Sequence, residues 1–205
     1  MTTVTEYSDH IVIDRHAQDV LFRQARTANA FTSEPVTDEQ VQALYDLVKW
    51  APTSFNQQPL RVVLVRSAEA RERLGTMMID NNRAKTLAAP LTAILAADTE
   101  FHRHLPTQFP VFPQAKDVLF GDPTVREESA LLNATLQIAY FIIGVRALGL
   151  AAGPMSGFDS AAVTKEFFPD GTARALVVVN LGRPADGARW DRLDRLGYEQ
   201  VFTTA

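Results

Sequence analysis

The longest apolar stretch of the chain, residues 130–152, sets the tightest limit on how it can fold. It lies within a predicted helix over 123–148, which Asp122 is expected to cap and Gly149 to end. From 131 to 145 apolar side chains occupy nearly every face of that helix, so other elements or a partner chain must bury it. Three polar residues that would be costly in hydrocarbon interrupt the stretch: Asn133, Gln137 and Arg146. We therefore expect a buried core helix here rather than a membrane span.

The composition is typical of an ordered globular protein. With 205 residues, of which 46% are apolar and 21% charged, the chain can form one substantial core, or a core completed by a second copy. The formal charge is −4 and the basic residues form no stripe, so nucleic acid is not an expected partner. Cysteine is absent, which excludes disulfides, thiolate metal sites and cysteine nucleophiles.

Residues 1–14 are polar and acidic, and they lack the apolar core of a secretory signal. We interpret them as an N-terminal tail and residues 15–205 as a single domain. The lack of a signal favours a cytoplasmic protein, and the polar interruptions of the apolar stretch argue against a membrane partner.

Helical and strand patterns alternate along 15–205, which indicates an α/β (α+β) protein with a central sheet flanked by helices. The strand patterns cover 61–66, 91–97 and 174–181. The helical patterns, besides the long apolar helix, cover 15–30, 37–48 with a capping box, 67–79 and 159–167. The other segments are a polar turn or short helix over 81–87, an aromatic and proline-rich excursion over 98–121, a rigid turn over 153–159, and a C-terminal arm over 183–205.

Residues 51–59 form a loop with the composition of a polar ligand site, where a predicted helix stops and a predicted strand begins. Pro52 and Pro59 make this loop stiff and remove two backbone donors. Between them lie short hydroxyls and amides, which suit the edge of a heterocycle better than a bare anion: Thr53, Ser54, Asn56, Gln57 and Gln58. An ordinary capped loop with polar side chains in water has the same composition, so the residues alone leave both interpretations open.

Familiar catalytic and metal motifs are missing from the sequence. No nucleophile elbow, P-loop or Gly-x-Gly-x-x-Gly turn follows a predicted strand. His102 and His104 could reach one metal from a strand, but no third ligand stands at a supporting spacing, so we expect no metal site. Any redox chemistry would therefore depend on a bound cofactor.

Five polar segments stand in a definite chain order. They are Arg26-Thr27-x-Asn29, Pro52-Thr53-Ser54-x-Asn56-x-Gln58-Pro59, Asn82-x-x-Lys85, Pro154-Met155-Ser156-Gly157-Phe158 and a C-terminal arginine. This order resembles the FMN-dependent nitroreductase family, from about Asp19 to the C-terminus. The resemblance is closest to the branch that contains the malonic-semialdehyde reductase of pyrimidine degradation. Its further matching segments are Lys49 to Ser54, Asp98-x-Glu100-Phe101 with Leu105-Pro106-x-x-Phe109-Pro110, Arg146 to Leu150 and Gly153 to Asp159.

The resemblance implies an FMN site at the interface of an intertwined homodimer, built on a nitroreductase-like central mixed sheet. It places Arg26, Thr27 and Asn29 at the phosphate, ribityl or pyrimidine edge, and Asn82 and Lys85 on the pyrimidine side. Four residues would line the ring, with a backbone N–H directed at N5: Pro154, Met155, Ser156 and Gly157. Four others would arrive from the partner chain, so that both subunits build each site: Pro52, Thr53, Ser54 and Asn56.

The phosphate end of this implied site has few basic residues. Arg192 or Arg195 matches the C-terminal arginine of the family, and a planar guanidinium suits the oxygens of a phosphate. Ala25 and Asn29 stand where many relatives carry a basic residue, so the basic contacts would be fewer here.

By the same resemblance, the chain would pass a hydride from NADH or NADPH through FMN to a small-molecule acceptor, in ping-pong order and without a side-chain nucleophile. The preferred acceptor would be malonic semialdehyde, reduced to 3-hydroxypropanoate. Two alternatives stay open: a broad nitroaromatic or quinone reductase, and a flavin-binding protein without turnover. The excursion over 98–121 is expected to close over the flavin as a lid.

Overall fold

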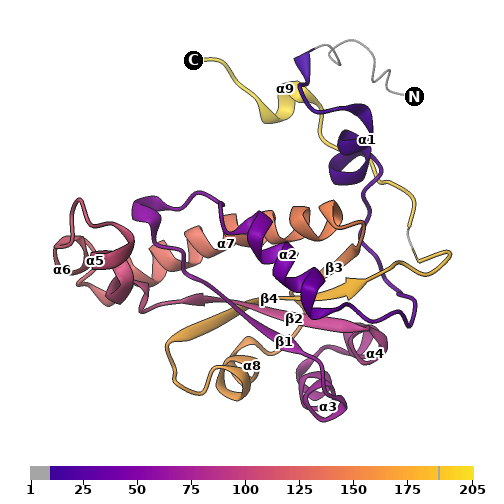
Figure 1. The fold of residues 1–205 in the computed structure, drawn as a ribbon, viewed down its shortest axis with the longest axis horizontal. Helices are drawn as coiled ribbons and strands as arrows, with labels where there is room; N and C mark the ends of the chain where they lie inside the picture. The colour runs from indigo at the N-terminus through magenta and orange to yellow at the C-terminus, as the bar shows by residue number, and fades with distance from the viewer. Residues whose placement is uncertain (1–9, 189) are drawn as a thin grey trace.

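The computed structural model describes residues 10–188 and 190–205, so residues 1–9 of the expected N-terminal tail lie outside the described residues. Four strands form one sheet in the order β1-β2-β4-β3 (Figure 1). Their bounds are β1 Leu60–Val65, β2 Leu91–Asp98, β3 Ala151–Met155 and β4 Ala173–Gly182. All three pairings are antiparallel, so the expectation of a mixed sheet is wrong for the described part of the chain.

The helices and single turns connect these strands in a fixed chain order. Before β2 they are α1 Arg15–Gln18, η2 Asp19–Arg23, α2 Asp38–Val48, η3 Ser54–Asn56, α3 Ala68–Met77 and α4 Asp80–Ala88. After β2 they are η4 Phe101–His104, α5 Leu105–Gln108, α6 Ala115–Val118, α7 Pro123–Ala147, α8 Ser160–Phe167 and α9 Tyr198–Val201. The predicted capping box of α2 at Thr37 and Gln40 is confirmed.

The sheet is the middle of three layers, with α2 and α7 on one face and α3, α4 and α8 on the other (Figure 1). All eight residues of β2 are buried, because this strand is central and covered on both faces. Leu91, Ala93 and Leu95 pack toward α7, whereas Ile94 and Ala96 pack toward α3 and α8. The expected arrangement of a central sheet flanked by helices is confirmed.

The long apolar helix is α7, which Asp122 caps and Gly149, at φ +71°, follows. In the described part of the chain it is the one helix long and apolar enough to cross a membrane by length and composition. It packs on the sheet, and two of its buried residues accept hydrogen bonds from the backbone of the preceding segment: Asn133 from the N–H of Ser54 in η3 and Gln137 from the N–H of Leu60 at the start of β1. Its outer face stays exposed at Leu132, Leu136 and Tyr140.

Two predicted segments differ in the structure. The first helix ends at Arg23 rather than Ala30, because residues 24–30 are drawn out along the end of the sheet, where Ala28 N–H donates to the carbonyl of Ala152 at 3.1 Å. The rigid turn over 153–159 begins as a strand, because residues 151–155 bond to β4. In both places tertiary backbone bonds override the local pattern.

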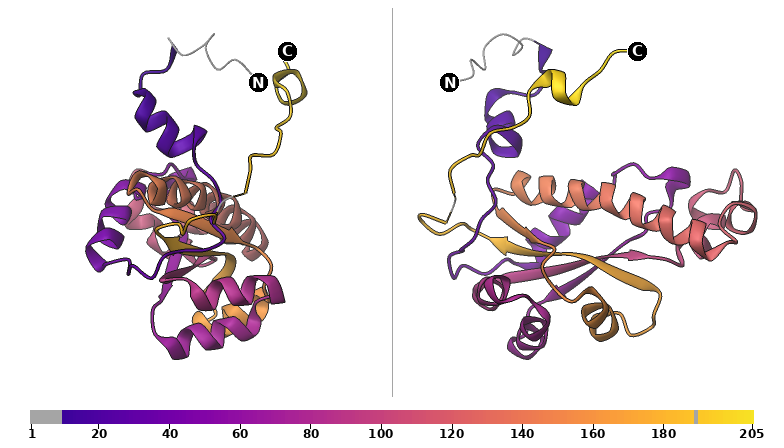
Figure 2. Two further views of the ribbon diagram at one scale, coloured as in Figure 1. Left: turned by 90° about the vertical axis from the view of Figure 1, so that its right-hand side faces the viewer. Right: turned by 180° about the vertical axis from the view of Figure 1, so that it is seen from behind.

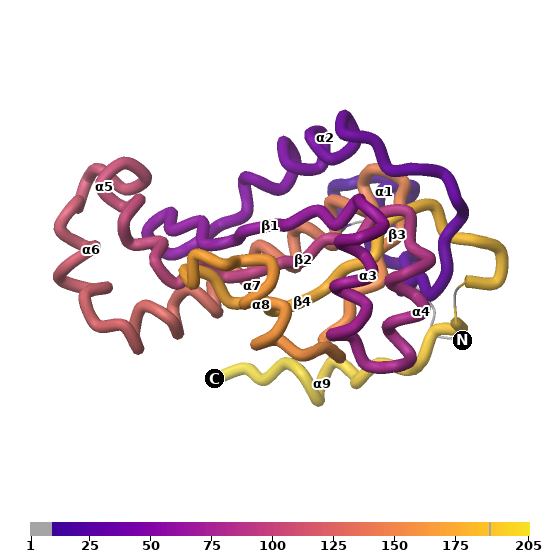
Figure 3. Tube along the Cα trace, turned by 90° about the horizontal axis from the view of Figure 1, so that it is seen from below, coloured from indigo at the N-terminus to yellow at the C-terminus, as the bar shows by residue number. Residues whose placement is uncertain are grey.

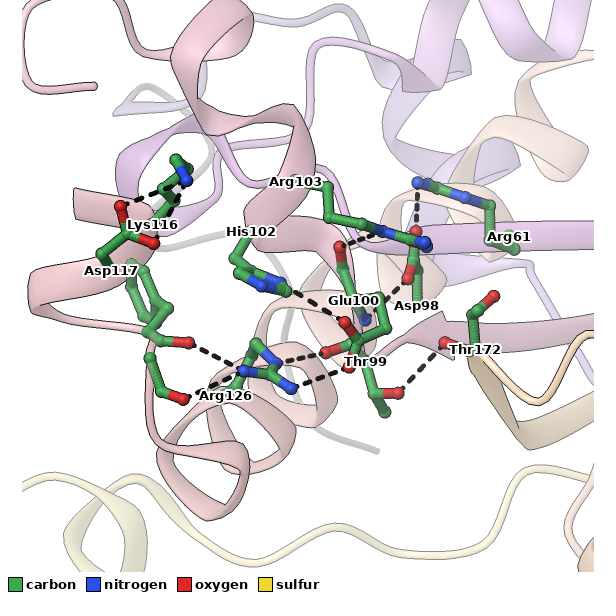
Figure 4. A network of polar contacts seen from close by, with 12 residues as sticks. Arg61, Asp98, Thr99, Glu100, His102, Arg103, Lys116, Asp117, Arg126 and Thr172 are labelled. Atoms are coloured by element: carbon green, nitrogen blue, oxygen red, sulfur yellow. Dashed lines mark hydrogen bonds and ion pairs between the residues drawn. The ribbon is translucent and has the colours of Figure 1, made fainter. Parts of the chain in front are cut away.

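The aromatic excursion over 98–121 is a packed lobe of short helices. Phe101 and Phe120 are buried in it, with ring centroids 5.1 Å apart. Arg126, in the first turns of α7, donates to the carbonyls of Thr99, Phe120 and Gly121 and forms a 2.8 Å ion pair with Glu100 (Figure 4). One guanidinium thus ties both ends of the excursion to the core helix.

The first described helix, α1, and the C-terminal arm with α9 both project from the α7 side of the three layers (Figure 2). The C-terminal arm exposes a series of large apolar side chains: Trp190, Leu193, Leu196, Tyr198, Val201 and Phe202. Arg192 in this arm donates to the carbonyls of Phe22, Arg23 and Ala25, which joins the arm to the segment after η2.

Candidate functional site

A cavity of about 380 Å³ opens where the extended segment after η2, the start of α4 and the end of β3 meet. Eight of the predicted site residues line it: Thr27, Asn29, Asn82, Lys85, Pro154, Met155, Ser156 and Gly157. Three chain segments that are far apart in sequence supply these residues. The tertiary structure therefore brings together most of the set expected to hold the flavin ring.

Two hydrogen bonds fix the polar wall of this cavity. Lys85 Nζ donates to Asn29 Oδ1 at 2.9 Å, so the ammonium is held half-buried at the cavity edge. Asn82 Nδ2 donates to the carbonyl of Gly157 at 3.1 Å, and the N–H of Ile79 donates to the same carbonyl at 3.2 Å. Together these bonds hold the first turn of α4 against the end of β3.

Two glycines of the cavity wall lie close to neighbouring atoms, one of them to backbone. A Cβ at Gly153 would come within 2.6 Å of the carbonyl oxygen of Ala28, and a Cβ at Gly157 within 2.4 Å of Ile79 Cδ1. Within the described chain the N–H of Gly157 donates no hydrogen bond, which leaves it available to a ligand. The close approach of backbone to backbone is what allows a flat group to lie along this wall.

A second cavity, of about 510 Å³, adjoins the first and shares Thr27 and Asn29 with it. Four arginines line it: Arg26, Arg146, Arg192 and Arg195. Within residues 10–188 and 190–205 none of the four forms an ion pair with a carboxylate, and Arg26 and Arg192 bond instead to carbonyls of residues 22–25. One carboxylate, Asp191, also lines the cavity without forming an ion pair with these arginines in the described part of the chain, so the lining carries a net positive charge.

The arginines of this second cavity affect one another. Burial, and then the charges of Arg26 and Arg195, lower the pKa of Arg192 from its ordinary value. Burial, and then the charge of Arg192, lower the pKa of Arg146. Like charges repel one another, so an anion placed among these arginines would offset their repulsion, and the planar guanidinium groups match phosphate oxygens. The two joined cavities thus suit a molecule with a hydrogen-bonding heterocycle at one end and a phosphate at the other.

Residues 22–183 match the model of the nitroreductase family, which is most of the chain. The chain belongs to the nitroreductase family. A relative in Streptomyces griseus, named "Putative NADH dehydrogenase/NAD(P)H nitroreductase", is 63% identical over 194 residues, which cover 95% of this chain and 98% of the relative. The family resemblance expected from the five ordered segments is confirmed.

Solved structures with the same fold include two nitroreductase-like proteins. One, from Exiguobacterium sibiricum, is titled a putative nitroreductase in complex with FMN; it has a TM-score of 0.80 at 16% identity and covers 92% of this chain and 96% of its own. The other, from Staphylococcus epidermidis, is titled a putative NAD(P)H:FMN oxidoreductase. It has a TM-score of 0.79 at 17% identity, and the match covers 95% of this chain and 98% of that protein. These likenesses establish the nitroreductase fold.

The proline loop, residues 51–59, lies elsewhere in this nitroreductase-family chain. The carbonyl of Pro59 accepts from Asp98 N–H at one end of β2, whereas Thr92, near the other end, pairs with Asn180 at the cavity. Six residues of strand separate Asp98 from Thr92, which is roughly 20 Å. Figures 1 and 3 likewise show the excursion with α5 and α6 at one end of the sheet and α4 with β3 toward the other. Within one chain, Pro52, Thr53, Ser54 and Asn56 therefore do not join the cavity.

The excursion over 98–121 lies beside the proline loop, so it cannot cover the cavity of its own chain. In a single chain, packing of the phenylalanines and the contacts of Arg126 hold this lobe at the far end of α7, and the lid over the flavin stays a prediction. A lid role is left only toward the site of a second chain.

Sequence reasoning missed two residues of the site. Asn180 lines the first cavity as a buried amide and accepts from Thr92 Oγ1 at 2.8 Å; its single polar side chain within an apolar strand was the available signal. Arg146 lines the second cavity, and its interruption of the long apolar helix was the signal. Among the described residues no cluster of three His, Asp or Glu side chains could hold a metal ion.

Proposed function

We propose that this chain is an FMN-dependent NAD(P)H oxidoreductase that reduces malonic semialdehyde to 3-hydroxypropanoate. One observation carries the FMN part of the proposal: an amide-lined cavity with a fixed lysine adjoins a cavity lined by four arginines that form no ion pair with any described residue, and these residues lie in the segments that carry the family resemblance. We also propose that the protein acts in the cytoplasm.

The enzyme class and the cofactor follow from the family. The chain is an oxidoreductase of the nitroreductase family that uses FMN, with NADH or NADPH as hydride donor. The donor set fits FMN, because amides and a backbone N–H suit the edge of the ring and arginines suit the phosphate. Asn82, Lys85 and Gly157 would hold the ring, and Arg26 with Arg192 would hold the phosphate.

Each of these residues has a distinct task. The ammonium of Lys85 would stabilise negative charge that develops on the pyrimidine side of the ring on reduction. The free N–H of Gly157 would act as a donor toward the ring, and Asn29 would orient Lys85 through the 2.9 Å bond. FMN supplies the hydride chemistry when bound, by accepting a hydride from NAD(P)H and donating it to the acceptor. Binding of the two substrates in turn at one site gives ping-pong kinetics, with the product proton drawn from water or from a side chain still to be assigned.

We further propose that the working form is a homodimer with two shared sites. The exposed stripe of Leu132, Leu136 and Tyr140 repeats every four residues along α7, which gives a second copy a continuous apolar face. The apolar arm adds area toward the roughly 1,200 Å² that stable interfaces bury. A second copy would also bring a proline loop to each cavity, which one chain leaves about 20 Å away.

The choice of acceptor rests on the branch-like segments of the sequence, including residues 98–110 and 153–159. A broad nitroaromatic or quinone reductase is the second candidate, and the names of the Streptomyces relatives favour it. Both candidates keep the same cofactor site and differ only in the acceptor.

The deciding experiment compares kcat/KM for malonic semialdehyde, a nitroaromatic and a quinone under one supply of NADH or NADPH. We expect the semialdehyde to be preferred. If the nitroaromatic or quinone is preferred by more than about tenfold, or roughly 1.4 kcal/mol in transition-state binding, the broad reductase replaces the semialdehyde reductase. Parallel lines in double-reciprocal plots would support ping-pong order, and intersecting lines would contradict it.

A further inference from the structure

We propose that Asn133, in the core helix α7, is a positioning residue that holds the proline loop in the shape needed for the flavin site of the partner. This inference rests on the proposed function, because the loop reaches a flavin only in a dimer. Asn133 belongs to none of the segments that carry the family resemblance, and it lies far from the cavity of its own chain.

The proline loop has an unusual backbone. Phe55, Asn56 and Gln58 have φ values of 52°, 51° and 46°, in the left-handed region that residues with a side chain rarely adopt. Three such residues within four positions persist only where surrounding contacts impose them, and such strain gathers at binding and catalytic sites. Contacts from outside the loop must therefore hold it.

The excursion supplies some of these contacts, since Asn56 and Gln58 donate to Gln108 and Phe55 packs against Phe109 and Phe120. The others come from polar residues of α7. Asn133 is 1% exposed, and its Oδ1 accepts from the N–H of Ser54 at 2.7 Å. Its Nδ2 donates to the carbonyl of Ser129, one turn earlier, at 2.9 Å. Ser129 Oγ in turn accepts from Gln57 Nε2 at 3.0 Å and donates to Gln57 Oε1 at 3.1 Å. Asn133 and Ser129 thus bind both ends of the turn from Ser54 to Gln57.

The hydrogen bonds from Asn133 and Ser129, called the clamp below, determine which side of the loop faces outward. Gln57 and Pro59 are buried against the core, whereas Pro52, Ser54 and Asn56 are exposed. The backbone N–H of Ser54 donates inward to Asn133 Oδ1, so the exposed hydroxyl of Ser54 stays free for a ligand. Three of the four loop residues expected to reach the flavin of a partner are therefore the ones that the clamp presents.

A polar residue inside an apolar core helix lowers stability unless its bonds are satisfied. Asn133 could serve packing alone, in which case its loss would destabilise the fold without a specific effect on ligand binding. The next buried amide along the helix, Gln137, provides a matched comparison. Gln137 Oε1 accepts from the N–H of Leu60 at 2.9 Å, so it makes the same kind of bond from the same helix, but to β1 rather than to the loop.

The test compares Asn133→Leu with Gln137→Leu in the full-length chain. FMN affinity is measured by quenching of flavin fluorescence on titration of the apoprotein, together with the melting temperature and the mass in solution. Both variants should lose similar thermal stability, since each leaves one buried N–H without an acceptor. Only Asn133→Leu should bind FMN at least about tenfold more weakly, and Gln137→Leu should stay within about twofold of wild type.

Equal FMN affinity in wild type and Asn133→Leu, or equal weakening in both variants, would overturn the inference. If Asn133→Leu does not fold, Ser129→Ala decides: FMN binding at least about threefold weaker supports the clamp, and unchanged binding overturns it. Failure of the wild type itself to bind FMN would instead refute the proposed function, so the two failures are distinguishable.

Discussion

Lys85 on α4 and Asn29 after η2 are joined by a 2.9 Å hydrogen bond across 56 positions of sequence. This bond holds a positive charge at the edge of the cavity that we assign to the flavin ring. The lysine has no carboxylate partner among the described ion pairs, so its charge is available to a ligand. The first prediction concerns this charge.

Lys85→Met keeps the aliphatic stem and removes the ammonium. We expect bound FMN to become harder to reduce, because the positive charge that stabilises the reduced ring is lost. A spectroelectrochemical titration should show a more negative midpoint potential than in wild type. Lys165→Met, in α8 beside a different cavity, is the control and should leave the potential unchanged. An unchanged potential in Lys85→Met would remove Lys85 from the ring site.

The unpaired arginines predict how tightly FMN binds. Arg26→Ala should weaken FMN binding by about ten- to a hundredfold, since a charge-assisted contact contributes roughly 1.5–3 kcal/mol. The wild-type protein should purify with about one FMN per chain. Arg174→Ala removes an exposed ion pair with Glu127 outside both cavities and should not change FMN affinity. Equal FMN affinity in wild type and Arg26→Ala would reassign Arg26 to the surface.

The exposed stripe of α7 predicts the oligomeric state. Leu136→Glu places a charge in the proposed interface, so the dimer should dissociate and FMN binding should fall with it. Light scattering coupled to size exclusion measures the mass directly. Ala161→Glu, at an exposed position of α8 on the opposite face of the sheet from α7, is the control and should remain dimeric. A wild-type protein that is monomeric and still binds FMN would contradict both the interface and the shared site.

His102 predicts a pH dependence of stability. Its Nδ1 is buried without a hydrogen-bond partner and lies 3.8 Å from Glu100, which already pairs with Arg126 (Figure 4). Burial, and then the charge of Arg126, lower the pKa of His102 below its ordinary value of 6.5 despite Glu100. As pH falls below that ordinary value the unfolded chain binds the proton first, so the free energy of unfolding decreases.

Melting temperatures at about pH 7.5 and pH 5.5 test this prediction. His102→Gln cannot titrate, so its melting temperature should fall less between the two pH values than that of wild type. His104→Gln, at an exposed position, controls for the loss of one histidine. Equal losses in wild type and His102→Gln would show that another group dominates the acid sensitivity of the fold.

Local rules in the sequence determined much of the fold. Asp122 and Gly149 bound the long helix, Thr37 and Gln40 form the capping box of α2, and the apolar run over 91–97 is a buried strand, all as predicted. These features depend on backbone donors at helix ends and on side-chain periodicity, which act over a few residues. The family and its cofactor were also predictable, because the ordered segments are short local motifs.

Tertiary structure alone decided where the local pattern ended and which groups met. The sequence pattern predicts a helix over residues 24–30, but these residues are extended. The reason is that the N–H of Ala28 donates to strand β3 and the N–H of Asn29 donates to the carbonyl of Ala188. Only the fold brings Asn180 to the first cavity and Arg146 to the second, and only the fold sets the proline loop about 20 Å from the cavity of its own chain. The physical reason is that packing, burial and long-range hydrogen bonds depend on contacts between distant segments, which local periodicity does not encode.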